Sequence, residues 1–149
     1  MSEPYYNIVK LIERLHRQFL DVLRNELRRL GIEDINAVQA LLLYNIGEDD
    51  VVIRDLKDRG YYHGTNVSYN IKSLTQAGYL VQERDQHDRR AMRLKLSDKG
   101  IALCQAIRQM QQLLAKKAAS QDATRNLSAA DSSLQALERL WTDYMRYGR

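Results

Sequence analysis

The stretch GYLVQERDQHDRRAMRLKLSDKG, residues 78–100, decides the fold. After Gly78, residues 79–84 have strand character, and residues 91–96 alternate apolar and basic side chains with a period of two. The polar run DQHDRR separates the two segments. This order predicts a β-hairpin, or wing, with one side on the core and a basic side in solvent. The expected core residues are Leu80, Met92, Leu94 and Leu96, and the expected solvent-facing residues are Arg84, Arg93 and Lys95.

The segment before the hairpin, residues 64–77, has helical periodicity and an unusual outer face. Val67, Ile71 and Leu74 share one side, at steps of four and three. A solvated helix usually carries Glu and Lys on its other side, but Lys72 is the only charged residue in this segment. Groups that donate and accept hydrogen bonds suit base edges and phosphates, which would repel a carboxylate. The outer face consists of Thr65, Asn66, Ser68, Tyr69, Lys72 and Ser73.

Basic charge is concentrated near the wing. The net charge is only +4, and residues 1–63 hold nine basic against eleven acidic residues. Residues 84–99 hold six basic against three acidic ones. A local basic patch is a weak sign of a polyanionic partner, because it is more often a solvated face.

Long helices are expected on both sides of this region. Apolar residues at three- and four-residue steps predict one helix from Tyr5 to Leu30, ending at Gly31. At about 1.5 Å per residue it is about 39 Å long, more than a domain of this size needs for its own core. Part of its apolar stripe is therefore expected to meet another chain. A second helix is expected after Asn36 as N-cap, ending at Gly47.

The remaining segments are less uniform. Residues 51–53 could form a short strand or begin a third helix over residues 53–59, and the pattern leaves both open. Ser97 is expected to cap a helix from Asp98 to about residue 119. The last helix is expected to begin at Ser128, where Asp131 completes the spacing of a capping box.

The totals predict one structural unit, residues 1–149, of a mainly α class with a small β-hairpin. One proline and seven glycines favour long helices joined by short turns. No apolar stretch approaches the roughly 20 residues that cross a bilayer, and the N-terminus lacks the order of a secretory signal, so a cytoplasmic location is expected. Cys104 is the single cysteine, and its place on an inward stripe favours a buried structural thiol over a redox sensor.

A helical triad followed by a basic wing is the winged form of the helix-turn-helix, whose recognition helix enters the major groove. Residues 53–100 also resemble the MarR family of regulators. The most specific stretches are DRRA at 88–91 and LKLSDKG at 94–100, while residues 67–80 resemble the family's recognition helix and first wing strand. The turn YYHG at 61–64 is more aromatic than the family's usual turn.

The resemblance implies a winged-helix DNA-binding lobe at 31–100 and a helical dimerisation region at 5–30 and 101–147. On the wing, it implies that Asp88 pairs with a nearby arginine, that Arg89 lies beside phosphate, and that Arg90 enters the minor groove. On the helix, Asn66 and Asn70 could address adenine, although Asn70 could equally point into the fold. The candidate DNA-binding residues are Thr65, Asn66, Ser68, Tyr69, Lys72, Arg84, Asp88, Arg89 and Arg90.

The expected function is that of a homodimeric, sequence-specific transcription regulator, and more specifically a ligand-responsive repressor. The resemblance implies a small aromatic or phenolic effector between the dimer helices and the DNA-binding lobe. The suggested wall residues are Tyr5, Tyr6, Arg14, Tyr44 and Tyr62. The competing class is a winged-helix module that contacts another protein without binding specific DNA. A redox switch through Cys104 is a third alternative.

Enzyme, cofactor and metal chemistry are not expected. The sequence holds no glycine-rich phosphate loop, nucleophile elbow or paired carboxylates beside a plausible base. The histidines, His16, His63 and His87, are isolated and do not have the spacing of metal ligands.

Overall fold

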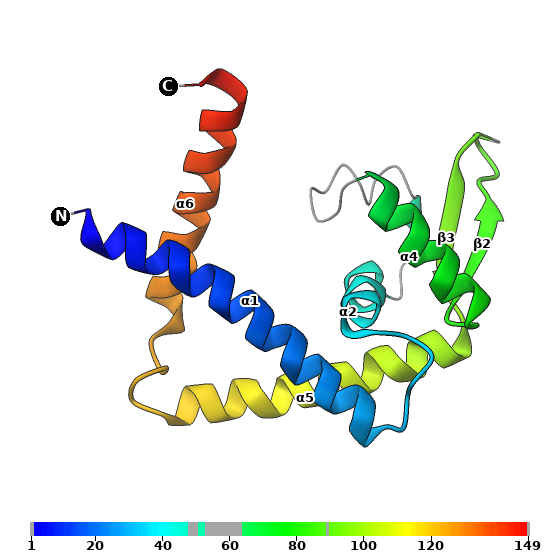
Figure 1. Cartoon of the computed structure of the whole chain (residues 1–149), viewed down its shortest axis with the longest axis horizontal. Coiled ribbons are helices and arrows are strands. Elements are labelled where there is room, and N and C mark those ends of the chain that lie inside the picture. Colours follow the sequence, from blue (N-terminus) through cyan, green and yellow to red (C-terminus); the bar gives the residue numbers. More distant parts are fainter. Residues whose placement is uncertain (1, 48–50, 53–63, 89, 149) are drawn as a thin grey trace. The chain divides into compact units, whose positions relative to one another are not determined.

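A computed structural model describes residues 2–47, 51–52, 64–88 and 90–148 of the chain (Figure 1). The chain falls into two compact units, Met1–Gln109 and Met110–Arg149. The first unit contains the whole stretch 31–100 that was expected to form the DNA-binding lobe. The possible helix over residues 53–59 lies outside the described residues.

Two helices open the first unit. Helix α1 (Glu3–Arg29) confirms the predicted long helix, and it buries only Leu23, Glu26 and Leu27. Helix α2 (Ala37–Ile46) begins with a capping box in which Asn36 Oδ1 accepts the backbone N–H of Gln39 at 2.8 Å. In return, Gln39 Oε1 accepts the backbone N–H of Asn36 at 3.0 Å. The predicted N-cap of α2 is therefore confirmed.

The strands form one antiparallel sheet in the order β1-β3-β2. Strands β2 (Leu80–Arg84) and β3 (Met92–Leu96) make the predicted hairpin, and β1 (Val51–Val52) adds to the other edge of β3. Residues 51–52 thus form a strand, one of the two alternatives that the sequence left open. Of the expected core residues, Leu80, Leu94 and Leu96 are buried and Met92 is half-buried.

Three further helices follow the predicted order. Helix α4 (Gly64–Gln76) precedes the hairpin, and α5 (Asp98–Ser120) follows Ser97, whose Oγ accepts the backbone N–H of Gly100 at 3.1 Å. Helix α6 (Leu127–Tyr147) begins after Asn126, so the predicted start and capping box at Ser128 are wrong. Asp131, the other member of that box, instead accepts a hydrogen bond from Gln135 Nε2 at 2.9 Å.

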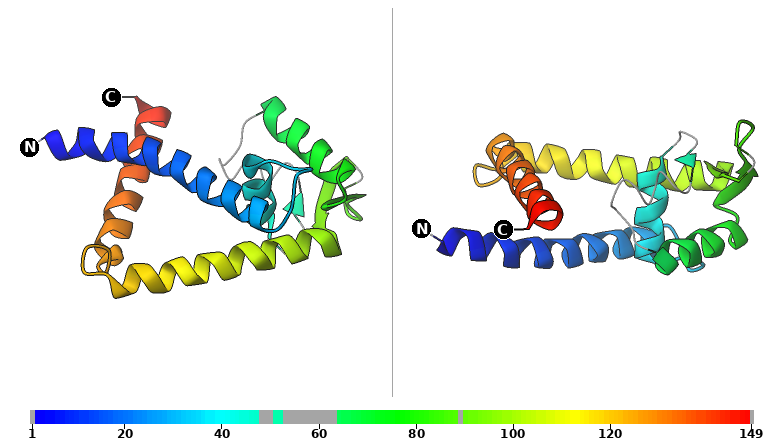
Figure 2. Two further views of the ribbon diagram at one scale, coloured as in Figure 1. Left: turned by 60° about the horizontal axis from the view of Figure 1, so that its bottom comes forward. Right: turned by 90° about the horizontal axis from the view of Figure 1, so that it is seen from above.

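The hydrophobic core of the first unit lies among its helices and the inner face of the sheet. Helix α2 packs against both α1 and α4, and α4 packs against β2 (Figures 1 and 2). Cys104 lies in this core at 1% exposure, which confirms the predicted buried thiol, and its Sγ contacts the backbone oxygen of Leu43 at 3.6 Å. The largest fully buried side chains are Tyr79, Leu23, Leu42, Leu43, Leu74, Leu94, Ile107, Val67 and Cys104.

Candidate nucleic-acid interface

Helix α4 has one buried and one exposed side, as the spacing predicts. Val67, Ile71 and Leu74 are at most 3% exposed and hold the helix on the core. Tyr69 lies on the other side at 68% exposure. Three polar candidates share this exposed side: Asn66, Ser68 and Lys72. Thr65 belongs to α4, but its side chain lies outside the part of the chain that is described.

Side-chain hydrogen bonds fix how α4 is rotated on its neighbours. Asn70 Oδ1 accepts a bond from Gln39 Nε2 of α2 at 3.3 Å, so this asparagine points toward the fold. On the same helix, Thr75 Oγ1 donates to the carbonyl of Ile71 at 2.7 Å and accepts from Gln82 Nε2 of β2 at 3.1 Å. Apolar packing sets which face is buried, and these directional contacts define the angle more closely.

The wing has its own internal brace. Arg93 of β3 pairs with Asp85 at 3.1 Å, Nε to Oδ1, and its side chain is 36% exposed rather than fully in solvent. Asp85 also ties the base of the loop, because its backbone N–H donates to the carbonyl of Ala91 at 3.0 Å. Burial would raise the pKa of Asp85, but the hydrogen bond and charge of Arg93, together with the backbone N–H of Asp88 and the charge of His87, hold the pKa below its ordinary value.

At the wing tip, Asp88 makes a different contact from the arginine pairing that the family resemblance implied. Its carboxylate accepts the backbone N–H of Arg90 at 3.0 Å, and the ion pair that braces the described hairpin is made by Asp85 instead. The Arg90 side chain is left exposed at the tip, and Arg84 is exposed at the end of β2. Arg89 lies outside the described residues.

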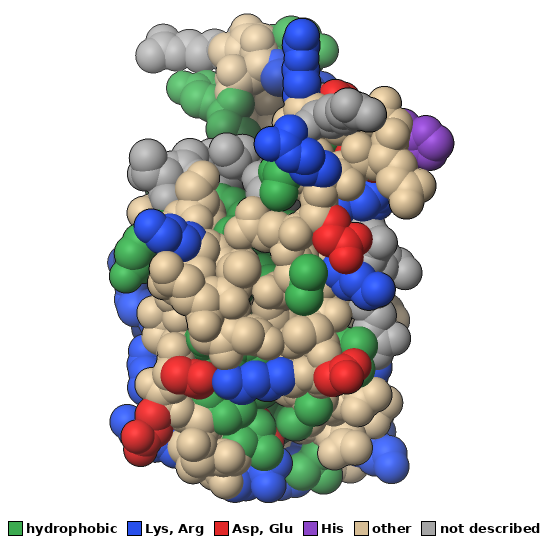
Figure 3. Space-filling model, turned by 90° about the vertical axis from the view of Figure 1, so that its right-hand side faces the viewer, with side chains coloured by type: hydrophobic (Ala, Val, Ile, Leu, Met, Phe, Trp, Pro, Cys, Tyr) green, Lys and Arg blue, Asp and Glu red, His purple; other side chains and the backbone are tan. Residues whose placement is uncertain are grey.

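The exposed side of α4 and the hairpin belong to one region of the first unit. Helix α4 packs against β2, next to the hairpin (Figures 1 and 2). In the space-filling view of this side, Lys and Arg side chains are spread over a surface that is otherwise largely uncharged, with Asp and Glu side chains between several of them (Figure 3). A polar helix face next to a basic ribbon has the chemistry that duplex DNA requires.

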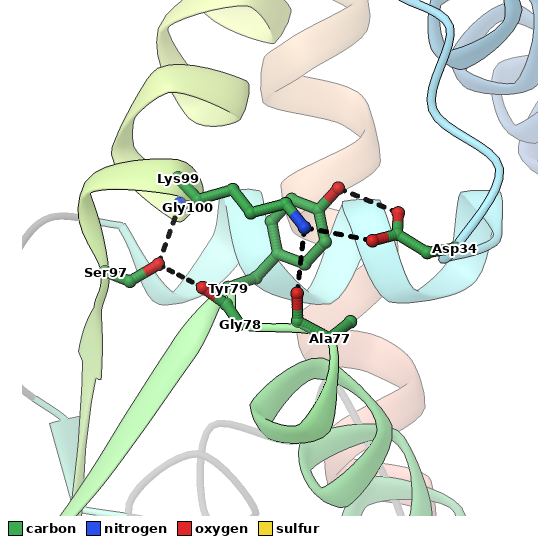
Figure 4. A network of polar contacts seen from close by, with 7 residues as sticks. All are labelled: Asp34, Ala77, Gly78, Tyr79, Ser97, Lys99 and Gly100. Atoms are coloured by element: carbon green, nitrogen blue, oxygen red, sulfur yellow. Dashed lines mark hydrogen bonds and ion pairs between the residues drawn. The ribbon is translucent and has the colours of Figure 1, made fainter.

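A cluster that the sequence did not reveal lies where α4 ends. Tyr79 is 2% exposed, and its hydroxyl donates to Asp34 Oδ1 at 2.9 Å (Figure 4). Lys99 Nζ donates to Asp34 Oδ2 at 3.0 Å and to the carbonyl of Ala77 at 2.9 Å. The same ammonium lies 4.3 Å from the centre of the Tyr79 ring. Asp34 is separated from Tyr79 and Lys99 by 45 and 65 residues, so no local spacing pointed to it.

The electrostatics of this cluster favour an ionised Asp34 and a neutral Tyr79. Burial would raise the pKa of Asp34, but the hydrogen bonds from Lys99 and Tyr79 and the charge of Lys99 together lower it. Burial, followed by the hydrogen bond and charge of Asp34, raises the pKa of Tyr79 to about 12. The hydroxyl of Tyr79 therefore remains a hydrogen-bond donor throughout the neutral range.

The described part of the chain has neither a metal-binding cluster nor a membrane-spanning helix. Its histidine, cysteine and acidic side chains form no group of three or more that could hold a metal ion. Its helices include none that is both long and apolar enough to span a membrane.

Comparison with known proteins agrees with this geometry. A family model described as a winged helix DNA-binding domain matches residues 35–100. The chain is 39% identical to the exopolysaccharide II synthesis transcriptional activator ExpG of Rhizobium meliloti (strain 1021), over 97% of this chain and 75% of that protein.

The fold is also that of solved regulators. FabT of Streptococcus pneumoniae in complex with DNA superimposes with a TM-score of 0.77 at 19% identity, over 93% of this chain and 98% of FabT. A MarR transcriptional regulator of Methanosarcina mazei Go1 gives 0.69 at 21% identity, over 92% and 98%. The wing, the recognition helix and the relative at 39% identity lead to one conclusion: the chain belongs to the MarR family of winged helix-turn-helix transcription regulators and is not an enzyme.

Proposed function

We propose that the chain is a sequence-specific regulator whose helix α4 enters the major groove of duplex DNA. The observation that carries the proposal is the exposed side of α4, where Asn66, Ser68, Tyr69 and Lys72 present hydrogen-bonding groups and no carboxylate. Asn66 is assigned to adenine, and Lys72 to guanine or phosphate. Asn70 takes no part in base recognition in this proposal, because its side chain is bonded to Gln39. Thr65 completes the proposed set.

The wing is proposed to contact the flanking minor groove and backbone. Arg90 is exposed at the tip of a hairpin that the Asp85–Arg93 pair holds in shape. An arginine on a narrow ribbon suits an A·T-rich minor groove, where the negative potential is strong. Arg84 and Arg89 are assigned to phosphates, and Asp88 supports the tip through its bond to the Arg90 backbone. The DNA in the FabT structure supports this use of the fold.

The regulator is further proposed to act as a homodimer. On α1, Ile8, Leu11 and Leu15 are exposed at steps of three and four residues, so they form an exposed apolar stripe. On α6, 21 residues long, no residue is buried although one side is apolar. A helix of this length gains most of its stability from packing its apolar side, and a second copy of the chain would supply that packing. Two recognition helices would then reach successive major grooves about 34–36 Å apart.

We propose that the protein activates transcription and does not repress it. The family resemblance favoured a repressor, but the relative at 39% identity is a transcriptional activator. A reporter gene placed behind a promoter that the protein binds distinguishes activation from repression. Expression that rises with the protein supports activation, and expression that falls supports repression.

We also propose that the protein binds a small aromatic or phenolic effector. We propose that the protein acts in the cytoplasm. Among the suggested wall residues, Tyr5 and Tyr6 stack edge to face with centroids 5.6 Å apart and are 41% and 59% exposed. Arg14 is exposed, Tyr44 is half-buried, and Tyr62 lies outside the described residues. A thermal-shift screen with aromatic acids and phenols tests for such a ligand, whose binding to the folded state raises the Tm.

Selection of bound fragments from random duplex DNA tests the DNA-binding proposal. The wild-type protein should enrich one motif with two related halves, and its affinity should fall steeply with salt as counterions are released. Asn66→Ala should broaden the base preference at one position of each half more than it lowers total affinity. If no duplex is bound even at low salt, the winged-helix module that contacts another protein becomes the better description.

A further inference from the structure

The cluster of Asp34, Tyr79 and Lys99 joins three segments that lie far apart in the sequence. Asp34 belongs to the linker between α1 and α2, Tyr79 follows the end of α4, and Lys99 lies in the first turn of α5. Figure 4 shows the side chains of Tyr79 and Lys99 converging on the Asp34 carboxylate. Lys99 also binds the carbonyl of Ala77, directly after α4, where a cation complements the partial negative charge of the helix end.

This cluster differs from the other polar contacts of α4. The bonds Gln39–Asn70 and Gln82–Thr75 connect α4 only to α2 and β2, which belong to the winged domain itself. The contacts of Lys99 connect the end of α4 to the linker that follows α1 and to the start of α5. The cluster itself lies within residues 31–100, but it ties α4 to the linker after α1 and to the first turn of α5, and both helices continue into the proposed dimerisation region.

A second set of hydrogen bonds holds the segment before α5 against the residues that follow α4. The backbone N–H of Ser97 donates to the carbonyl of Tyr79 at 3.0 Å, and Ser97 Oγ donates to the carbonyl of Gly78 (Figure 4). Gly100 lies so close that a Cβ there would come within 2.3 Å of the Tyr79 carbonyl oxygen. The end of α4 therefore has little room to move relative to the first turn of α5.

We propose that Asp34, Tyr79 and Lys99 are positioning residues that set the tilt of the recognition helix and thereby the half-site separation that the dimer accepts. This inference rests on the proposed function. Helix α4 is about 20 Å long, so a tilt of about 5° at its C-terminal end moves its N-terminal end by about 1.7 Å. Recognition helices contact bases mainly through their N-terminal residues, and hydrogen bonds to base edges do not tolerate such a shift.

The exposure of the charged pair supports positioning over stabilisation as its main role. The side chains of Lys99 and Asp34 are 51% and 46% exposed. Ion pairs this open to solvent contribute little to folding stability. A variant that breaks the pair should therefore leave the protein folded and change the geometry of α4 first.

The test uses duplexes that carry the selected half-sites at separations varied by one base pair at a time. The wild-type protein should prefer one separation. Asp34→Asn and Lys99→Met should bind that duplex about tenfold more weakly and discriminate less between separations, while binding to random duplex stays within about twofold. Lys99→Arg, which keeps the cation, should restore much of the preference. Lys116→Met removes an equal charge from an exposed position of α5 and should behave as wild type.

Hydrogen exchange on the free protein tests the same inference without DNA. The backbone N–H groups of residues 77–79 are bonded to carbonyls of α4, and they should exchange faster in Asp34→Asn and Lys99→Met than in the wild type. Unchanged exchange, or a separation preference identical to that of the wild type, would overturn the inference. A wild-type protein that selects no DNA would instead refute the proposed function, and the exchange rates would still decide whether the cluster holds the end of α4.

Discussion

Gly100 shows how much one residue without a side chain can contribute. It lies in the first turn of α5, where the carbonyl of Tyr79 occupies the place that a Cβ would take. The contact is with backbone, so a neighbouring side chain cannot rotate away to relieve it. The glycine in the stretch SDKG is thus required by close approach.

Gly100→Ala should consequently destabilise the protein, by about 1–3 kcal/mol if it behaves like other overpacked sites. The sign is informative, because alanine is favoured over glycine by about 1 kcal/mol in an unhindered helix. Urea unfolding of the variant and the wild type measures the difference. A variant as stable as the wild type, or more stable, would mean that α5 can shift without cost.

Asp34 predicts a pH dependence of stability at the same scale. Its folded-state pKa is lowered, so it stabilises the fold above the unfolded-state value of about 3.9, and this contribution disappears as the pH falls through the folded-state pKa. Asp34→Asn should lower the urea midpoint at pH 7 by a small amount, because the pair with Lys99 is about half exposed, and the difference from the wild type should shrink as the pH falls below about 3.9. A difference that is constant with pH would contradict the charged contact with Lys99.

At the scale of the element, different arginines of the wing brace the hairpin and are proposed to contact DNA. Arg93 is used internally by its pair with Asp85, whereas the side chain of Arg90 is exposed at the tip. Two arginines only three positions apart on one ribbon therefore have different proposed roles, although they carry the same charge.

Arg90→Ala should weaken DNA binding by about tenfold, since arginine contacts to DNA are commonly worth about 1–3 kcal/mol. The melting temperature should stay near that of the wild type, because the side chain is exposed. Arg125→Ala is the matched control, since Arg125 is an exposed arginine in the segment between α5 and α6 whose partner, Asp122, is also exposed. Equal affinity of Arg90→Ala and Arg125→Ala would remove Arg90 from the interface.

Helices and strands with a regular spacing of apolar residues could be predicted from the sequence, whereas contacts between distant segments could not. The spacing of Val67, Ile71 and Leu74 predicted which side of α4 is buried, and the alternation around Leu94 predicted the hairpin. A two-residue strand such as β1 is too short to show a period, so its pairing with β3 appears only in the fold.

The hydrogen-bond and ion-pair partners of polar side chains were predicted less well, because they depend on the strand register and on which distant segments the fold brings together. The hairpin register and the loop place Asp85 within reach of Arg93, so the expected pairing role of Asp88 passed to a residue three positions earlier. The orientation of Asn70 depended on Gln39, 31 residues away. Asp34 gave no signal at all, since its partners come from the ends of other elements.

At the scale of the whole molecule, the apolar sides of the long helices matter most. Within α6, Leu134 and Leu140 are 45% and 58% exposed and lie on one side with Trp141 and Tyr144. An exposed apolar side of this extent marks an interaction surface. Because such a side would be buried twice in a symmetric pair of chains, a charge placed on it would be desolvated without a partner in both copies.

Leu134→Glu should therefore convert a dimer into monomers at micromolar concentration, as measured by light scattering coupled to size-exclusion chromatography. Ser132→Glu adds the same charge to the opposite side of the same helix and should remain dimeric. The monomeric variant should also lose most of its affinity for a duplex with two half-sites, while a duplex with one half-site is bound about as weakly as by the wild type. This last comparison matters because it links assembly to recognition: if Leu134→Glu were monomeric yet bound the two-half-site duplex at full strength, α6 would not be what brings the two recognition helices together.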